Sequence, residues 1–187
     1  MRSAQVIVAS FLTVIFTGCI PSLYPLYTET ELTYVPDLIG SWEESSEGGE
    51  NDIWKFEQTD SVTYALTYFE DSVPAPFEAH VLTLGKNLFI DIRPERPESA
   101  NDLQKALLLP VHLFGRLSLT KDTLTIGWLD GDWLKRKMES ETVSLSHTLI
   151  DSDLLLTASP QELQSFVLKH LDDADAFPVS TYSRVGE

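Results

Sequence analysis

The chain has 187 residues and is strongly acidic, with 29 aspartates and glutamates against 13 lysines and arginines and a formal net charge of −16 at pH 7. Such a surface argues against nucleic acid and anionic headgroups as partners, because like charges repel. The length suits one domain with a buried core. A single cysteine, Cys19, rules out an internal disulfide.

The first 18 residues have the layout of a secretory signal. Arg2 is followed by an almost uncharged apolar run that is too short to span a bilayer comfortably, and then by small residues. The stretch Phe16-Thr17-Gly18-Cys19 resembles the lipobox of bacterial lipoproteins, although Phe16 stands where that family usually has Leu. The resemblance implies cleavage before Cys19 and acylation of this cysteine, with palmitate among the acyl chains.

The lone cysteine supports the same interpretation independently. Cysteines of exported proteins usually pair in an oxidising compartment, so an unpaired Cys19 needs an explanation other than a free thiol. Several acyl chains, at about 0.8 kcal/mol for each buried methylene, hold a protein on a bilayer far longer than one chain does. Lipoproteins kept at the inner membrane commonly carry Asp after the cysteine. By that resemblance Ile20 points to the outer membrane, facing the periplasm or the outside.

Residues 20–37 read as a tether that becomes part of the domain. Three prolines and the interleaved Tyr24, Leu26 and Tyr27 predict an extended segment that packs partly on the domain. A pure spacer would instead be polar and rich in Gly or Ser. The stretch 22–32, with Gly40-Ser41-Trp42 soon after it, resembles the opening of a family of proteobacterial lipoproteins, and this resemblance implies no activity.

Short segments of alternating hydrophobicity predict strands from residue 39 onwards. The clearest is 61–68, where Val62, Tyr64, Leu66 and Tyr68 share one face. Similar segments follow at 77–81, 88–92, 111–119, 124–128, 143–149, 154–157 and 179–184. They predict a mainly β, antiparallel meander closed or folded on itself. The expected organisation is a signal peptide at 1–18, a lipid-anchored strap at 19–37 and one β-rich domain at 38–187.

Two helices are expected to interrupt the strands. Ser159 and Glu162 match a capping box, and Pro160 suits the first position of an amphipathic helix over 160–171. A shorter helix is predicted from Asp132 to Met138, with basic residues near its C-terminal end. Residues 93–104 predict a polar loop over one end of the sheet.

The triplet Gly40-Ser41-Trp42 is similar to the G-x-W triplet that opens lipocalins, and a late helix followed by a short strand is a second similarity. The resemblance implies an eight-stranded barrel in which Trp42 packs beneath an arginine at the closed end, either Arg184 or Arg116. A barrel of this size can just hold one small ligand. A β-sandwich, or a half-barrel with a helix, is the alternative, and the helix near 132–139 is foreign to the lipocalin layout.

Aromatic residues on the strand faces are the candidate ligand contacts. A ligand cavity and an ordinary packed core would use the same side chains, and periodicity does not separate the two. The residues are Trp54, Tyr64, Tyr68, Phe77 and Trp128.

The sequence contains no motif that specifies catalysis, a metal or a cofactor. The four histidines, His80, His112, His147 and His170, lack metal-ligand spacing, although His80 and His112 can meet across strands. No G-x-S-x-G turn or glycine-rich phosphate loop is present. A turn and a helix cap explain the residues 130–132. We expect no cofactor and no metal.

These patterns favour a non-enzymatic, lipid-anchored envelope lipoprotein that binds a partner or supports assembly. The partner can be a basic protein or an uncharged lipophile. A lipocalin-like carrier of a small apolar ligand is the first alternative, and it predicts an internal cavity bordered by Tyr64, Tyr68 and Trp128. A hydrolase of envelope polymers stays open as a third class, because an acidic chain brings some carboxylates together by chance. An interaction module predicts an exposed apolar patch.

Overall fold

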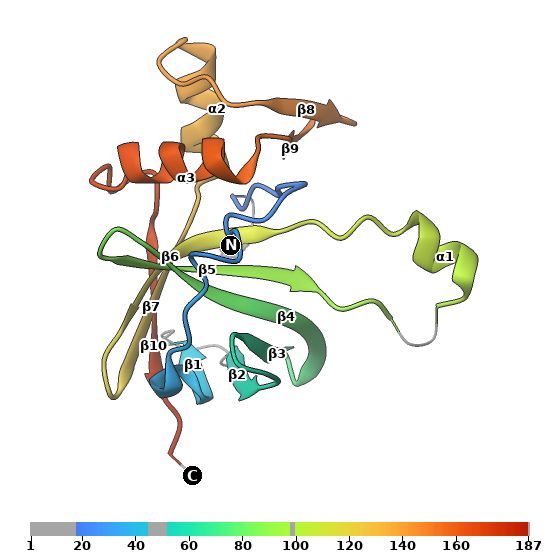
Figure 1. The fold of residues 1–187 in the computed structure, drawn as a ribbon, viewed down its shortest axis with the longest axis vertical. Coiled ribbons are helices and arrows are strands. Elements are labelled where there is room, and N and C mark those ends of the chain that lie inside the picture. The colour runs from blue at the N-terminus through green and yellow to red at the C-terminus, as the bar shows by residue number, and fades with distance from the viewer. Residues whose placement is uncertain (1–17, 45–51, 98–99, 187) are drawn as a thin grey trace, which may run out of the picture.

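A closed antiparallel barrel of eight strands forms the centre of the protein, in the order β1-β10-β7-β6-β5-β4-β3-β2 (Figure 1). The computed structural model describes residues 18–44, 52–97 and 100–186, so the expected signal peptide lies outside the described residues except for Gly18. The barrel strands are β1 Gly40–Glu44, β2 Ile53–Gln58, β3 Thr63–Glu70, β4 Val73–Leu84, β5 Asn87–Pro94, β6 Leu113–Leu119, β7 Thr123–Trp128 and β10 Val179–Arg184. The predicted mainly β meander is confirmed, and it closes on itself as a lipocalin-like barrel does.

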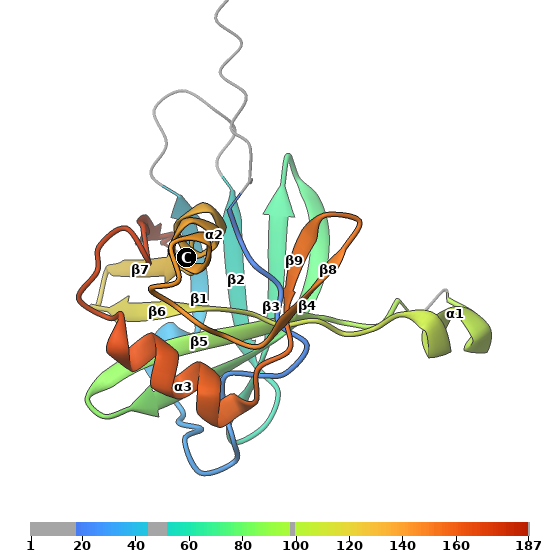
Figure 2. The same ribbon diagram turned by 90° about the horizontal axis from the view of Figure 1, so that it is seen from above.

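A second layer covers one side of the barrel (Figure 1 and Figure 2). Within it β8 and β9 form a separate two-stranded sheet. Outside the barrel the elements are the 3-10 turn η1 Pro36–Leu38, α1 Asp102–Leu107, α2 Gly131–Glu139, β8 His147–Ile150, β9 Asp153–Leu156 and α3 Pro160–Lys169. Of these, α2, α3 and the β8–β9 hairpin form the layer, whereas α1 projects away from the barrel.

Alternate residues of the strands point inward and fill the barrel. Trp54 is central: its ring lies 5.2 Å from Tyr68, 5.8 Å from Trp128 and 5.8 Å from Tyr182, measured between ring centroids. The fully buried residues of this interior core include Trp42, Phe56, Tyr64, Ala79, Val81, Ile90, Leu124 and Ile126.

A separate core lies between the outer face of β4–β6 and the second layer. Outward-pointing side chains of these strands pack against apolar residues of α2, α3 and β9; those from the strands are Leu82, Leu84, Phe89 and Phe114. The helix α3 begins where the sequence predicts, because Ser159 and Glu162 form the expected capping box. An amphipathic helix therefore finds its apolar partner on the outside of the barrel, not inside it.

Several local expectations differ from the structure. The strand expected at 143–149 begins only at His147, as β8, and its pair with β9 lies outside the barrel. The segment expected as a polar loop covering the sheet contains the helix α1, which Asn101 and Gln104 start with a reciprocal capping box. The helix points away from the barrel (Figure 1). The α2 helix begins at Gly131, one residue before the predicted start, because Asp130 accepts a hydrogen bond from the Trp133 N–H and serves as the cap.

Trp42 and Arg184 face each other across the seam between the first and last strands. The guanidinium carbon of Arg184 lies 4.1 Å from the centre of the Trp42 ring, within reach of a cation–π interaction. The same guanidinium donates hydrogen bonds to the backbone oxygens of Asp37, Ile39 and Lys121. One side chain thus joins the η1 turn, the β6–β7 turn and the barrel seam.

We expect Arg184→Ala to lower the free energy of unfolding by about 2 kcal/mol, because it removes charge-assisted hydrogen bonds and the contact with Trp42. Denaturant titration measures this loss. Arg116→Ala is the matched control: Arg116 is exposed on β6 and donates one long hydrogen bond of 3.4 Å to Leu171. Its removal should change stability by less than about 0.5 kcal/mol. Equal losses for the two variants would contradict the closing role of Arg184.

Candidate functional site

The strap, residues 19–37, crosses the outer face of β4–β6 and is hydrogen-bonded to it. Ser22 forms backbone bridges to His112 and to Leu156, so it lies between the start of β6 and the end of β9. Further along, the Thr33 N–H donates to Val81 at 2.9 Å. The strap therefore behaves as an added, discontinuous strand.

A buried carboxylate, that of Asp91, lies under the strap. Asp91 is 1% exposed and projects outward from β5, while its neighbours Ile90 and Ile92 point into the barrel. Its Oδ2 accepts a hydrogen bond of 2.8 Å from the Leu26 N–H of the strap. Its Oδ1 lies 2.6 Å from Nδ1 of His112. Both oxygens of the carboxylate are thus engaged, one by the strap and one by the residue that precedes β6.

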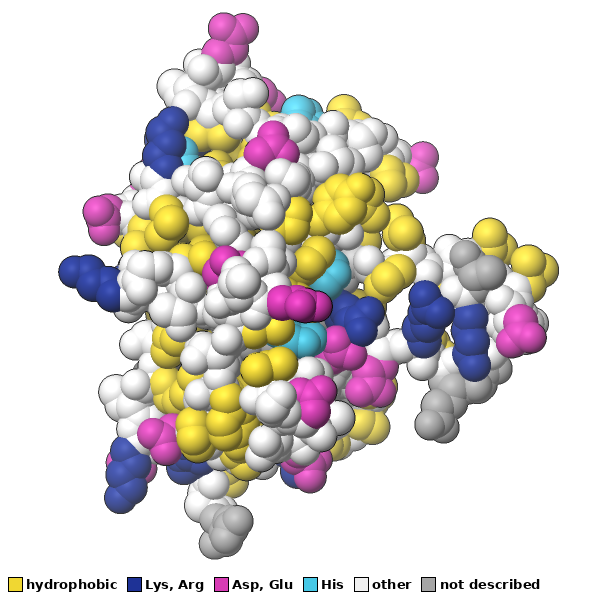
Figure 3. Space-filling view, in the orientation of Figure 1, with side chains coloured by type: hydrophobic (Ala, Val, Ile, Leu, Met, Phe, Trp, Pro, Cys, Tyr) yellow, Lys and Arg dark blue, Asp and Glu magenta, His cyan; other side chains and the backbone are white. Residues whose placement is uncertain are grey.

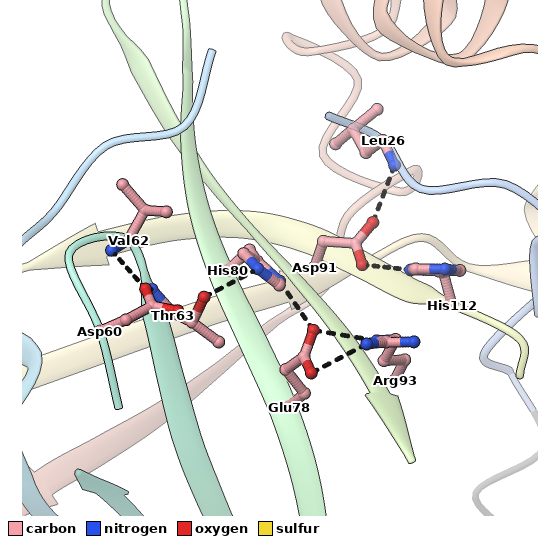
Figure 4. Close-up of polar contacts among 9 residues, drawn as sticks. All are labelled: Leu26, Asp60, Val62, Thr63, Glu78, His80, Asp91, Arg93 and His112. Carbon is pink, nitrogen blue, oxygen red and sulfur yellow. Dashed lines mark hydrogen bonds and ion pairs between the residues drawn. The ribbon is translucent and has the colours of Figure 1, made fainter. Parts of the chain in front are cut away.

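Two histidines flank Asp91 (Figure 4). His80 is its cross-strand partner on β4, and His112 comes from the start of β6. Both are 7% exposed. Tyr27 of the strap covers them, with ring centroids 4.6 Å from His80 and 6.4 Å from His112. Three strands and the strap therefore meet at one carboxylate.

An ion pair borders this cluster on the solvent side. Glu78 and Arg93, opposite each other on β4 and β5, form two parallel hydrogen bonds of 3.0 and 2.8 Å. Glu78 also lies 3.8 Å from Nδ1 of His80, whose Nε2 is 3.3 Å from the Thr63 hydroxyl. Figure 4 shows these contacts beside the hydrogen bonds that Asp91 makes with His112 and Leu26.

The surroundings shift the ionisation of the cluster. Burial raises the pKa of Asp91, while the hydrogen bonds from His112 and from the Leu26 N–H act in the opposite direction. Burial also lowers the pKa of His80, against the attraction of Glu78 and Asp91. The pKa of Tyr27 rises to about 12 through burial and the nearby carboxylates. These shifts favour a neutral His80 and a protonated Tyr27 at pH 7.

The Asp91–His112 pair has a geometry that also orients imidazoles in acid–base catalysis and around metals. The part of the chain that the structure describes contains no group of three or more His, Cys, Asp or Glu side chains arranged to hold a metal ion. Asp91 is occupied by the strap amide as well as by His112. The role that this arrangement supports best is therefore to hold the strap on the barrel through the hydrogen bonds of Asp91.

The aromatic residues proposed as ligand contacts all belong to the barrel interior. Trp54, Tyr68 and Trp128 contact one another through the Trp54 ring. Tyr64 is fully buried, and its hydroxyl accepts a hydrogen bond of 2.7 Å from the Val35 N–H. Phe77 packs at the edge of the same cluster. The rings of Tyr68 and Trp128 thus both pack against the ring of Trp54 in the barrel interior.

The remaining proposed residues and the other two histidines lie at four other places. Trp42 and Arg184 contact each other at the barrel seam. Cys19 is half-buried at the start of the strap and forms a backbone bridge to Asp130. His147 is exposed, and His170 packs against aromatic rings of the outer core.

Sequence reasoning missed Asp91 and the part that Tyr27 plays. The signal for Asp91 was present, since a lone acidic residue inside the apolar run 88–92 must either face solvent or find partners. His80 and His112 were recognised as residues that can meet across strands, but β5 and Asp91 lie between them. Nothing in the sequence showed that the strap would supply the second partner of the carboxylate.

We expect Asp91→Ala to lower the free energy of unfolding by about 3 kcal/mol, because it leaves the buried Leu26 N–H and His112 without their partner. Hydrogen exchange should show faster exchange of the strap amides at the same time. Glu78→Ala is the control, since it removes a carboxylate of the same cluster that is 29% exposed. That loss should stay below about 1 kcal/mol. An Asp91 variant no less stable than the control would show that the strap does not depend on this carboxylate.

Comparison of the chain with protein-family models, with curated proteins and with solved structures found no match. What the chain does must therefore be inferred from the arrangement of its own residues. That arrangement consists of a barrel whose interior aromatic rings contact one another, a strap fastened over its outer face by Asp91, and Cys19 at the start of the strap.

Proposed function

We propose that this chain is a lipid-anchored lipoprotein of the bacterial envelope whose barrel is a non-enzymatic binding or assembly-support module. The observation that carries the proposal is the position of Cys19, the lone cysteine, at the start of the strap, where its backbone forms a bridge to Asp130. Ile20 is already buried, and Gly131 approaches so closely that a Cβ there would lie 2.9 Å from Cγ1 of Ile20. An acyl chain on Cys19 would therefore hold the barrel directly, without a loose spacer.

The chemical state of Cys19 supports an anchor in preference to a reactive thiol. Burial, and to a smaller extent the charge of Asp130, raises the pKa of the Cys19 thiol. A raised pKa reduces the thiolate fraction, and the thiolate is the form that attacks disulfides and binds metals. Redox chemistry at Cys19 is disfavoured for this reason.

Membrane attachment through lipid also agrees with the helices. None of the helices in the described residues combines the length and the hydropathy of a membrane-spanning segment. We place the protein at the outer membrane, because Ile20 follows the cysteine where inner-membrane lipoproteins commonly have Asp. The net charge of −16 suits a basic protein partner or an uncharged lipophile and disfavours nucleic acid.

Cys19→Ser tests the anchor. Expressed in a Gram-negative host and labelled with radioactive palmitate, the wild-type chain should take up label and shorten, whereas the variant should remain an unlabelled precursor. The control is the double variant Cys19→Ser, Ser144→Cys, whose one cysteine lies at an exposed position. It should also stay unlabelled. Label retained by Cys19→Ser would refute the lipoprotein assignment.

A lipocalin-like carrier is the second candidate function, and the closed eight-stranded barrel favours it. Tyr68, Phe77 and Trp128 are only partly buried, so this end of the interior is the least shielded. The Trp54 ring contacts both Tyr68 and Trp128, however. An apolar ligand would have to displace these rings, and their packing makes the carrier the weaker of the two candidates.

Native mass spectrometry separates the two candidates. Residues 20–187, exported to the periplasm and purified without detergent, should show the mass of the polypeptide alone and should take up no offered fatty acid or phospholipid, because aromatic rings fill the interior. A discrete added mass that disappears on denaturation would instead support the carrier and identify its ligand. Trp54→Ala, which opens the centre of the aromatic cluster, is the positive control for uptake.

A further inference from the structure

Between β5 and β6, residues 100–110 form an arm that extends away from the barrel (Figure 1). Apolar side chains dominate its outer end. The leucines Leu103, Leu107, Leu108 and Leu109 are 70%, 76%, 48% and 60% exposed. Figure 3 shows hydrophobic side chains on this projecting lobe beside basic and acidic side chains.

This arm has little support from its own secondary structure. The α1 helix has six residues, and helices this short are marginal in water unless tertiary packing stabilises them. The capping box at Asn101 and Gln104 starts the helix, but the leucines after it remain exposed. Several adjacent exposed leucines form the kind of patch that marks a contact surface.

The charge of the arm differs from that of the chain as a whole. Between Asp102 and Asp122 the sequence contains no acidic residue, although the chain has 29 of them, and Lys105 lies among the leucines. Asp102, next to Leu103, is the one acidic residue of 100–110, and Leu107, Leu108 and Leu109 have no acidic neighbour in the sequence that would repel them from a headgroup layer. The other exposed apolar tip, Leu149 and Ile150 of β8, is followed at once by Asp151 and Asp153 and lacks this property.

The C-terminal end of the arm returns to the barrel close to the residue that we propose is lipid-anchored. His112, just after the arm, forms a backbone bridge to Ser22, three residues from Cys19. Three extended residues span at most about 11 Å. The acyl chains on Cys19 and the root of the arm would therefore meet the same region of a bilayer.

We propose that the leucine arm, residues 100–110, lies in the surface of the bilayer to which Cys19 is anchored, with its leucines beneath the headgroups. This inference rests on the lipid anchor proposed above. A bilayer suits the arm better than a protein partner does, because protein hot spots favour Trp, Tyr and Arg, whereas the outer end of the arm is aliphatic. With Cys19 as one attachment and the arm as a second, the barrel would keep one orientation on the membrane.

Fluorescence quenching by lipid tests the arm. The full chain is purified from membranes as wild type, as Leu107→Cys and as Lys86→Cys, and each is treated with the thiol-reactive dye NBD. Lys86 is the matched control, because it is exposed at the β4–β5 turn, at the opposite end of β5 from the arm. The proteins are reconstituted into phosphatidylcholine vesicles with and without lipid that carries a nitroxide on its acyl chain.

The wild-type chain should not react with the dye, because acylation blocks Cys19. The dye at position 107 should shift to the blue in vesicles and lose most of its emission to the nitroxide, while the dye at position 86 should keep most of its emission. A wild-type chain that reacts at Cys19 would refute the anchor itself. A blocked Cys19 with equal quenching at both positions would overturn the arm proposal alone. A blue-shifted dye at 107 that the nitroxide leaves unquenched would also overturn it, and would place the arm against protein.

Discussion

The carboxylate of Asp91 is the interaction on which the arrangement of the outer face depends. A carboxyl group buried this far is tolerated only when hydrogen bonds replace the water that it has lost. The barrel supplies one such bond through His112, and the strap supplies the other through the Leu26 N–H. The strap is therefore required by the barrel, and a segment that looks like a tether becomes a structural element.

This fastening changes what an anchor at Cys19 would do. A flexible tether lets a domain move freely above the membrane, whereas a chain bonded to the barrel from Ser22 onwards holds it close. Two attachments are needed to define an orientation, and the leucine arm has the composition and the position to be the second. The buried carboxyl group, the strap and the C-terminal end of the arm thus lie close together around the backbone bridge between Ser22 and His112.

Two separate hydrophobic cores stabilise the described part of the fold. The interior core closes the barrel around Trp54, with Arg184 fastening the seam above Trp42. The outer core holds α2, α3 and the β8–β9 hairpin on the β4–β6 face. The aromatic residues expected to line a cavity contact one another through the Trp54 ring, so these rings are part of the interior core.

The sequence alone determined the elements whose signals are local. Alternation predicted the strands, and the capping box at Ser159 predicted α3, since each depends on residues a few positions apart. Barrel closure, the position of the strap and the Asp91 site needed the tertiary structure, because they join residues such as Leu26, Asp91 and His112 that are far apart along the chain. A period of two in the sequence shows which residues share a face of a strand. It does not show which distant backbone amide will satisfy a buried carboxylate, because that depends on how the strands and the strap are brought together in space.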